Sequence, residues 1–302
     1  MKNQASESAG IVAAARAVVS VAPQRDRIIE DHYAKYFFNG RYTVLGELMK
    51  LVSIAPRSYY LYSILNKVAN VLVRRPNGPV AIAVRHHYID ERIKEYVTAG
   101  AEQVILLGAG FDMRAYRLGL NNVQFIEVDH FLTQRQKLKR LKKIKNLPKA
   151  KVKYCVVDFT RDWLPQLEKA NVIKNEKSVF VLEGISMYLG EDELAYTLLA
   201  IKKLCPLGAN LLFDTMTEEG VLENSDLKKK KWNLDWIIPP DKEPIIWGTS
   251  YENLEELLEK YGFKLLDNIG LIDYGRVINK NQGCFIPDLD GWPLSLNDAF
   301  FK

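Results

Sequence analysis

Cysteine is scarce in this sequence of 302 residues: only Cys155, Cys205 and Cys284 occur, and no two of them form a CxxC pair. An odd number of widely spaced cysteines argues against a disulfide framework and against a cysteine zinc site. The sequence also lacks the GxSxG, HExxH and Walker motifs of hydrolases, zinc proteases and nucleoside triphosphatases. We therefore expect a reducing, cytoplasmic environment and no bound metal.

Long apolar runs are missing as well. No stretch approaches the roughly 18 uncharged apolar residues that a membrane-spanning helix needs. The segment from Ile11 to Val21 is apolar like a signal peptide core, but Arg16 interrupts it and Glu7 precedes it, so we expect an ordinary amphipathic helix. The 42 basic and 37 acidic residues leave a net charge of only +5, which suits contact with anions but demands neither nucleic acid nor a membrane.

Apolar residues make up 48% of the chain, and a chain of this length can bury a core without disulfides or metal. Before Gly100, helical spacing of apolar residues predicts helices at Ala9–Ser20, Asp31–Phe38, Leu45–Val73 and Val80–Val97. After Gly100, short apolar segments predict strands at Val104–Leu107, Gln124–Val128, Val152–Val157, Ser178–Leu182, Asn210–Phe213, Lys264–Leu266 and Cys284–Ile286. Between them, helical patterns occupy Phe111–Leu118, Leu132–Ile144, Asp162–Ala170, Glu191–Leu204 and Tyr251–Tyr261.

This alternation of strands and helices predicts an α/β fold whose mostly parallel sheet is covered by helices on both faces. We expect residues 1–99 to form a helical cover integral to the fold and residues 100–302 to form the core. Residues 215–249 break the alternation with a lysine run followed by a segment rich in tryptophan and proline. A segment of this length inside a compact domain predicts a lid-like insertion.

The apolar segment Val104–Leu107 runs directly into Gly108-Ala-Gly110. Glycine at the carboxyl end of a parallel strand allows a tight turn and lets a ligand approach the backbone closely. The dinucleotide fingerprint GxGxxG is incomplete, because Met113 stands where the third glycine would be. A tight turn without a ligand is the alternative.

Carboxylates follow the next two strands. Asp129 ends the second strand, where an acidic residue can accept hydrogen bonds from both hydroxyls of a ribose; Glu127, two residues earlier, is its rival. Asp158 follows the third strand and could accept from an adenine amino group, with Phe159 beside the ring. The alternative is that Asp158 or Thr160 caps the next helix.

Glu183 follows the fourth strand, which is apolar enough to be central, so the charge requires a partner. A ligand ammonium would supply it, or a neighbouring arginine in a purely structural ion pair. Arg85 could bind a ligand carboxylate through its planar fork, or lie on a solvated helix face. His86 and His87 are possible bases, although no nucleophile is visible near them.

Glycines at one strand end and carboxylates at three others suit a nucleoside with a cationic tail. S-adenosylmethionine fits this description better than a nicotinamide dinucleotide, whose pyrophosphate prefers positive potential without extra carboxylates. A different class of function is suggested by residues 134–153, which contain ten basic residues and no acidic one. Such a stretch could bind RNA or an acidic protein, but its helical apolar spacing also fits a solvated helix face.

The segment Leu107–Arg117 (LGAGFDMRAYR) resembles the G-x-G-x-D-T-R-x-x-R-L segment of the leucine carboxyl methyltransferase family. The family's later segments resemble FIEVD at 125–129, VDFTRDW at 157–163 and EGISMYL at 183–189. AAAR at 13–16 and DHYA at 31–34 are similar to the amino-terminal helices of its bacterial branch. The resemblance covers about residues 9–215, with Met113 in place of the usual threonine and ISM at 185–187 in place of a leucine-rich run.

The resemblance implies a Rossmann-like class I methyltransferase fold with a seven-stranded sheet. It also implies that S-adenosylmethionine contacts Arg85, Gly108, Asp129, Asp158, Phe159 and Glu183, to which the glycine turn adds Gly110. We expect O-methylation of a small acid, a peptide end or a polyketide-type intermediate, with Arg16, Arg114 and Tyr188 orienting the acceptor. A carboxylate acceptor is already ionised at neutral pH, so it needs no strong base. The alternatives are a nicotinamide-dependent oxidoreductase and a non-catalytic binder of RNA or acidic protein through residues 134–153.

Overall fold

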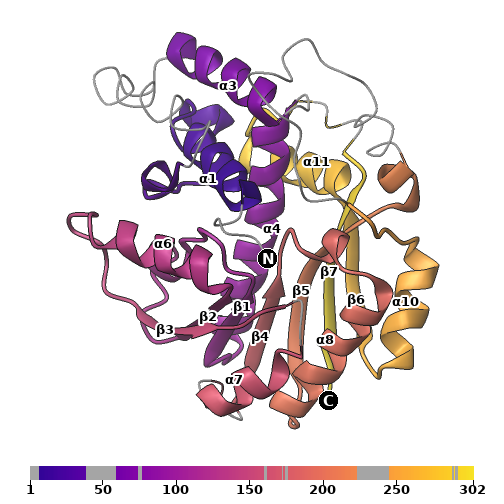
Figure 1. Ribbon diagram of the computed structural model, residues 1–302. Helices are drawn as coiled ribbons and strands as arrows, with labels where there is room; N and C mark the ends of the chain where they lie inside the picture. Colours follow the sequence, from indigo (N-terminus) through magenta and orange to yellow (C-terminus); the bar gives the residue numbers. More distant parts are fainter. Residues whose placement is uncertain are drawn as a thin grey trace.

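The computed structural model describes residues 7–38, 59–73, 77–159, 162–171, 173, 176–222, 245–287, 289 and 292–302. Its centre is a seven-stranded sheet with the order β3-β2-β1-β4-β5-β7-β6 (Figure 1). The strands are β1 (Gln103–Leu107), β2 (Gln124–Asp129), β3 (Lys151–Val156), β4 (Ser178–Leu182), β5 (Ala209–Met216), β6 (Lys264–Gly270) and β7 (Leu294–Phe301). Strands β1 to β5 pair in parallel, whereas β7 runs antiparallel to both β5 and β6. The predicted fold class is confirmed.

Helices cover both faces of this sheet. Helices α4 (Gly78–Thr98), α5 (Arg114–Arg117) and α11 (Leu271–Gln282) pack on one face, and α7 (Leu164–Ala170), α8 (Glu191–Leu204) and α10 (Tyr251–Lys260) on the other. Every residue of β1 and β4 is buried. Central parallel strands lie between two helical layers, which is why these segments read as continuous apolar runs in the sequence.

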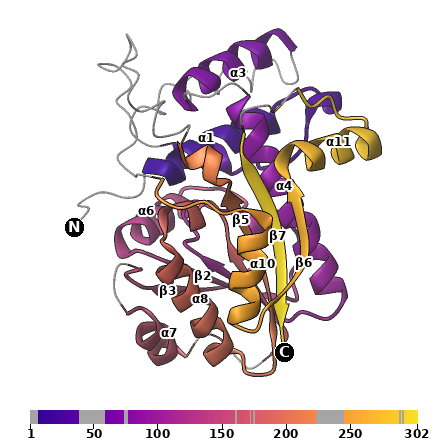
Figure 2. The ribbon, with the colours of Figure 1, turned by 90° about the vertical axis from the view of Figure 1, so that its right-hand side faces the viewer.

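The amino-terminal helices lie above the carboxyl ends of the parallel strands, as Figure 2 shows. Helix α1 (Glu7–Ser20) packs against α3 (Tyr59–Val73) and α4, and short 3₁₀ segments η1 (Gln24–Asp26) and η2 (Ala34–Phe37) follow α1. Ala13 of α1 packs against Phe111 and Met113 in the turn after β1. The amino-terminal segment therefore covers the edge of the sheet where the candidate site residues lie.

Some predicted elements differ from the structure. Cys284–Ile286 is not a strand; the last strand is β7, and α11 was not predicted. β7 carries Asn297 and Asp298 at its centre, and both residue types are rare in strands. They are tolerated because Asn297 Nδ2 donates to Thr215 Oγ1 at 3.1 Å and Arg92 forms an ion pair with Asp298.

Other boundaries move as well. The helix expected at 111–118 is shortened to α5, and the one expected at 31–38 is limited to η2. Residues 215 and 216, expected to begin the insertion, belong to β5, and residues 218–222 are helical. Residues 45–58 of a predicted helix, residue 160 and residues 223–244 of the predicted lid lie outside the described residues.

A buried ion pair fastens the turn after β1 to the sheet. Helix α6 (Phe131–Leu141) places Lys137 Nζ 2.6 Å from Glu127 Oε2 of β2, and each side chain is 1% exposed. Lys137 Nζ also donates to the carbonyl oxygen of Asp112 in that turn. Burial raises the pKa of Glu127 to about 7, although Lys137 opposes the shift. Glu127, the rival for the ribose, therefore lies beneath α6 rather than at the edge of the sheet.

We expect Phe180→Ala to lower the free energy of unfolding by about 3–5 kcal/mol, because it removes a fully buried ring from the centre of β4. Urea titration followed by circular dichroism measures the change. Leu207→Ala, at a side chain that is 72% exposed, is the matched control and should change stability by less than about 0.5 kcal/mol. Equal effects of the two substitutions would contradict the assigned core.

The Glu127–Lys137 pair predicts a pH dependence of stability. Between the ordinary pKa of 4.5 and the raised value of about 7, the folded protein holds a proton on Glu127 that the unfolded chain releases. The free energy of unfolding should therefore fall as pH rises through this window, by on the order of 2 kcal/mol, relative to Glu127→Gln. Urea unfolding of both proteins at pH 5 and pH 8 measures the difference. A constant difference between the two proteins at both pH values would refute the assignment.

Candidate functional site

The turn after β1 has the conformation that its glycines allow. Gly108 and Gly110 have φ angles of +68° and +50°, and the amide of Gly108 donates to the carbonyl of Val128 at 2.8 Å. A Cβ atom on Gly108 would lie 1.9 Å from Cδ1 of Ile185, in the segment that follows β4. Left-handed backbone and close approach both favour glycine here. The two predicted glycines thus lie at the carboxyl edge of the sheet.

Asp129 lies beside this turn at the end of β2. One carboxylate oxygen accepts from the amide of Gly110, and the other accepts from the amide of His130 at 2.6 Å. Burial raises the pKa of Asp129, and the two backbone hydrogen bonds oppose that shift. Each carboxylate oxygen has a second lone pair with which it can accept from a ligand hydroxyl. The structure brings Asp129 and Gly110 together, and the ribose contact stays a prediction.

Asp158 and Phe159 follow β3 and are half-buried. The neighbouring amide of Val157 donates to the carbonyl of Asp129 at 3.0 Å, which joins the ends of β2 and β3. The Phe159 ring packs edge-on against Trp163, with ring centroids 5.6 Å apart. The N-cap of α7 is Trp163. Asp158 therefore does not cap this helix, and its contact with adenine stays a prediction.

Glu183, directly after β4, is surrounded by basic side chains. Its Oε1 accepts from Arg85 Nε at 2.9 Å and lies 3.1 Å from Nδ1 of His86, and its Oε2 lies 2.7 Å from Nη1 of Arg114. Burial opposes ionisation, but Arg114, His86 and Arg85 outweigh it and hold the pKa of Glu183 well below its usual range. The sequence left a ligand ammonium or a neighbouring arginine as the partner of Glu183, and the structure shows arginine.

Arg85 is buried in α4, so the alternative of a solvated helix face is wrong. Its Nη1 donates to Oδ2 of Asp214 at 3.0 Å, and Oδ1 of Asp214 accepts from the amide of Gly184 at 2.6 Å. Sequence reasoning missed Asp214. The signal was available: Asp214 directly follows the apolar run Leu211–Phe213 of β5, and a charge at the end of a buried strand requires a partner.

Arg114 is fully buried, and other protein groups contact its guanidinium nitrogens. Its Nε donates to Oδ1 of Asp90 at 2.6 Å, its Nη1 forms an ion pair with Asp112, and its Nη2 lies 2.5 Å from Nδ1 of His86. Three carboxylates, counting Glu183, raise the pKa of Arg114 against the effect of burial. The guanidinium therefore joins α4 to the glycine turn, and an additional contact with the acceptor stays a prediction.

Arg16 of α1 has a similar environment. Its Nε donates to Asp31 Oδ2 at 2.8 Å, its Nη2 donates to the carbonyl of Phe111 at 2.6 Å, and its Nη1 lies 3.2 Å from Nε2 of His86. Both ring nitrogens of His86 thus face guanidinium groups. Burial lowers the pKa of His86 to about 4, and Arg114 and Arg16 add to that effect. His86 is consequently neutral near pH 7 and a weak base.

Tyr188 ends the short 3₁₀ segment η4 (Ser186–Tyr188), half-buried, five residues after Glu183. It interacts electrostatically with Arg85. The end of the insertion lies beside η4, since the amide of Ile246 donates to the carbonyl of Met187 at 2.9 Å. Tyr188 thus lies between the edge of the sheet and the end of the insertion, where an acceptor-orienting role stays a prediction.

His87, the second possible base, lies apart from this cluster: its Nδ1 is 3.0 Å from the hydroxyl of Tyr274 in α11. Within the described ranges, no group of three or more histidine, cysteine, aspartate or glutamate side chains could hold a metal ion. No described helix combines the length and the apolar composition needed to cross a membrane.

Solved structures share this architecture. A structure named "putative methyltransferase" from Thermobifida fusca YX matches with a TM-score of 0.53 and 13% identity, covering 79% of this chain and 88% of that one. A DUF574 family protein from Streptomyces avermitilis matches with a TM-score of 0.52 and 13% identity, covering 79% and 90%. These matches support the class I methyltransferase fold.

The sequence comparisons go further. The Bacillus subtilis (strain 168) protein "Putative S-adenosyl-L-methionine-dependent methyltransferase YktD" is 26% identical over 209 residues, which are 68% of this chain and 67% of that protein. A protein of the same description from Mycobacterium sp. (strain JLS) is 29% identical over 221 residues, or 72% and 68% of the two chains. The family model of leucine carboxyl methyltransferases matches residues 9–202. The chain therefore belongs to the leucine carboxyl methyltransferase family.

Proposed function

We propose that this S-adenosylmethionine-dependent methyltransferase methylates an oxygen atom, and that the acceptor is the carboxylate of a small acid, a peptide end or a polyketide-type intermediate. The observation that carries this proposal is the state of His86. It is held between the guanidinium groups of Arg16 and Arg114, and its pKa is lowered to about 4. A weakly basic histidine at this position suits an acceptor that is already ionised at neutral pH.

The residues at the edge of the sheet fit the cofactor. The Gly108–Gly110 turn allows close approach to the backbone, and Asp129 has lone pairs available for the ribose hydroxyls. Asp158 and Phe159 lie beside Asp129 for the adenine. S-adenosylmethionine, when bound, would supply an electrophilic methyl carbon, which a nucleophilic oxygen could attack while S-adenosylhomocysteine leaves as a neutral thioether.

For the amino-acid end of the cofactor we propose Arg85 and Glu183 as partners. The planar fork of Arg85 can bind a carboxylate, and Glu183 can bind an ammonium group. Both side chains are buried and already paired with each other at 2.9 Å, so their positions are fixed before a ligand arrives. The protein's contribution to the reaction is orientation, which can be worth several kcal/mol in a displacement between two bound groups.

Of the three residues expected to orient the acceptor, Arg16 and Arg114 are paired with the buried carboxylates of Asp31, Asp90, Asp112 and Glu183. Tyr188 lies between Glu183 and the segment that returns from the insertion. We propose that Tyr188 contacts the acceptor, whereas the two arginines hold the glycine turn and His86 in place. Family membership excludes the nicotinamide-dependent oxidoreductase considered from the sequence, since the cofactor of this family is S-adenosylmethionine.

We expect Asp129→Ala to weaken S-adenosylmethionine binding at least about tenfold, because two hydrogen bonds to the ribose hydroxyls are lost. Isothermal titration calorimetry measures the dissociation constant. Asp273→Ala, at an exposed carboxylate of α11, is the matched control and should bind like the wild type. Thermal unfolding of both variants shows whether the fold is retained. A folded Asp129→Ala protein with unchanged affinity would remove Asp129 from the cofactor site.

The bond formed by methyl transfer is testable with methyl-labelled cofactor and bacterial small-molecule extracts. We expect labelled product that releases methanol after mild base treatment, because methyl esters hydrolyse under these conditions. Base-stable label on oxygen would indicate an ether and would exclude the carboxylate while keeping O-methylation. Label on nitrogen or carbon would contradict O-methylation.

A further inference from the structure

A groove of about 390 Å³ runs along the outer side of α6, next to the edge strand β3. Its walls consist of three apolar side chains, Phe131, Leu138 and Val156, of three cationic ones, Arg135, Lys139 and Lys142, and of Gln134. Phe131 is 51% exposed and Val156 is 43% exposed. Large apolar side chains left in water beside a groove mark a surface that another molecule can cover.

The outward face of α6 forms one wall of the groove, and the opposite face of the helix packs against the core. Phe131, Arg135, Leu138 and Lys139 are spaced by four, three and one residues, so they share one side of the helix. On the other side, Lys137 is paired with Glu127. Gln134, which lines the groove beside β3, donates from its Nε2 to the carbonyl of Cys155 at 3.1 Å. Helix α6, which forms one wall of the groove, is therefore fixed against the sheet.

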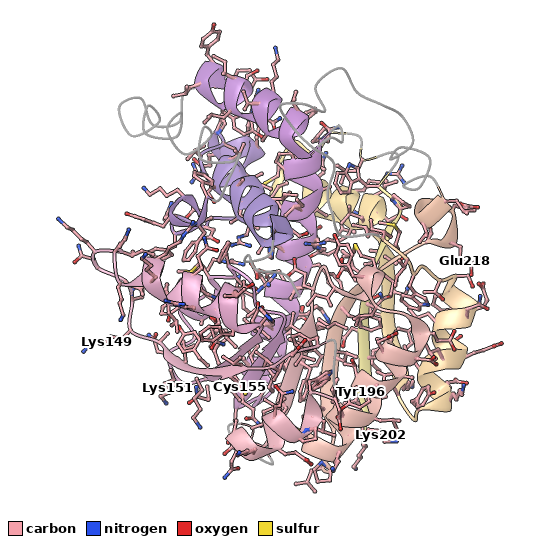
Figure 3. All side chains as sticks on the ribbon, in the orientation of Figure 1. Lys149, Lys151, Cys155, Tyr196, Lys202 and Glu218 are labelled. Atoms are coloured by element: carbon pink, nitrogen blue, oxygen red, sulfur yellow. The ribbon has the colours of Figure 1, made fainter. Side chains whose placement is uncertain are left out.

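The charge of this surface has one sign. Residues 131–153 contain no acidic residue. In the part of the chain that the structure describes, no carboxylate forms an ion pair with Arg135, Lys139 or Lys142, whereas their buried neighbour Lys137 has Glu127. Figure 3 shows Lys149 and Lys151 projecting to solvent on the same side of the molecule. An acidic partner would complement this surface.

We propose that the groove docks an acidic amphipathic helix of a partner protein. Its apolar residues would lie between Phe131, Leu138 and Val156, and its carboxylates would face Arg135, Lys139 and Lys142. A helix that lays its apolar face into such a groove is a common recognition mode, with anchors spaced at three and four residues. This inference is independent of the methyl acceptor.

The chemistry of the walls favours a helix over RNA. Single-stranded nucleic acid is bound on several stacking aromatic rings, but this groove has one aromatic ring, Phe131, and two aliphatic side chains. Strand addition at the free edge of β3 is disfavoured by the lysines at Lys151 and Lys153, because charged residues on an edge strand oppose further pairing. A concave groove also differs from the protruding apolar face that an interfacial membrane helix presents.

The position of the groove places the partner beside the cofactor site rather than over it. Phe131 comes two residues after Asp129, and Val156 comes two residues before Asp158. Tyr188 and the end of the insertion lie next to the end of β4, which β1 separates from β2 and β3 in the sheet. A docked helix would therefore leave the acceptor side of the edge open.

The test uses the full-length protein and a fluorescently labelled synthetic helix with leucines at positions i, i+4 and i+7 and glutamates beside them. Fluorescence anisotropy measures its dissociation constant, and a scrambled peptide of identical composition controls for charge alone. The triple substitution Arg135→Glu, Lys139→Glu and Lys142→Glu should weaken binding by at least about tenfold. The matched triple substitution Lys143→Glu, Lys145→Glu and Lys149→Glu changes the same charge outside the groove and should weaken binding by less than about threefold.

Phe131→Ala, which changes no charge, should also weaken binding of the designed helix, and circular dichroism verifies that each variant folds. Several results would overturn the proposal: no binding of the designed helix, equal binding of the scrambled peptide, or equal losses in the two triple variants. Binding of polyuridine RNA or of phosphatidylglycerol vesicles that is tighter and lost in the groove triple variant would assign the surface to those ligands instead.

Discussion

The buried ion pairs around Glu183 are the interaction on which the rest of the structure depends. They join four parts of the chain: Arg85 of α4, Arg114 after the glycine turn, Glu183 at the tip of β4 and Asp214 in β5. Taking a charge out of water is costly, and the cost is recovered only when partners and hydrogen bonds are well placed. Loss of one member would leave the others buried and unpaired, so these elements are held together as a unit.

This cluster also links the fold to the chemistry. Two of the groups that stabilise the edge of the sheet, Arg85 and Glu183, are also those that we propose to bind the carboxylate and ammonium of the cofactor's amino-acid end. Because Glu183 and Arg85 are positioned by protein partners, little reorganisation is needed for binding. Arg16 extends the cluster to α1, and burial, assisted by Arg114 and Arg16 against Glu183, lowers the pKa of His86 to about 4. A weakly basic imidazole of this kind is consistent with the ionised acceptor that we propose.

Much of this arrangement could be predicted from sequence because it depends on local patterns. Gly108, Asp129 and Glu183 each stand at the end of a short apolar strand, and this local pattern predicts that they lie at the carboxyl edge of a parallel sheet. The pairings of the charged residues could not be predicted, because they join distant positions: Arg85 meets Asp214 across 129 residues, and Arg16 meets Phe111 across 95. The sequence did not predict β7 for a related reason. Asn297 and Asp298 have a low strand propensity, and tertiary partners that are distant in sequence stabilise them in the strand.

The most direct measurement is a crystal structure of the protein with S-adenosylhomocysteine. We expect the ribose hydroxyls within hydrogen-bonding distance of the Asp129 carboxylate, the adenine beside Asp158 and Phe159, and the amino-acid end between Arg85 and Glu183. A ligand bound elsewhere on the molecule would contradict this assignment. So would a ligand at this edge of the sheet with Asp129 still bonded only to the amides of Gly110 and His130.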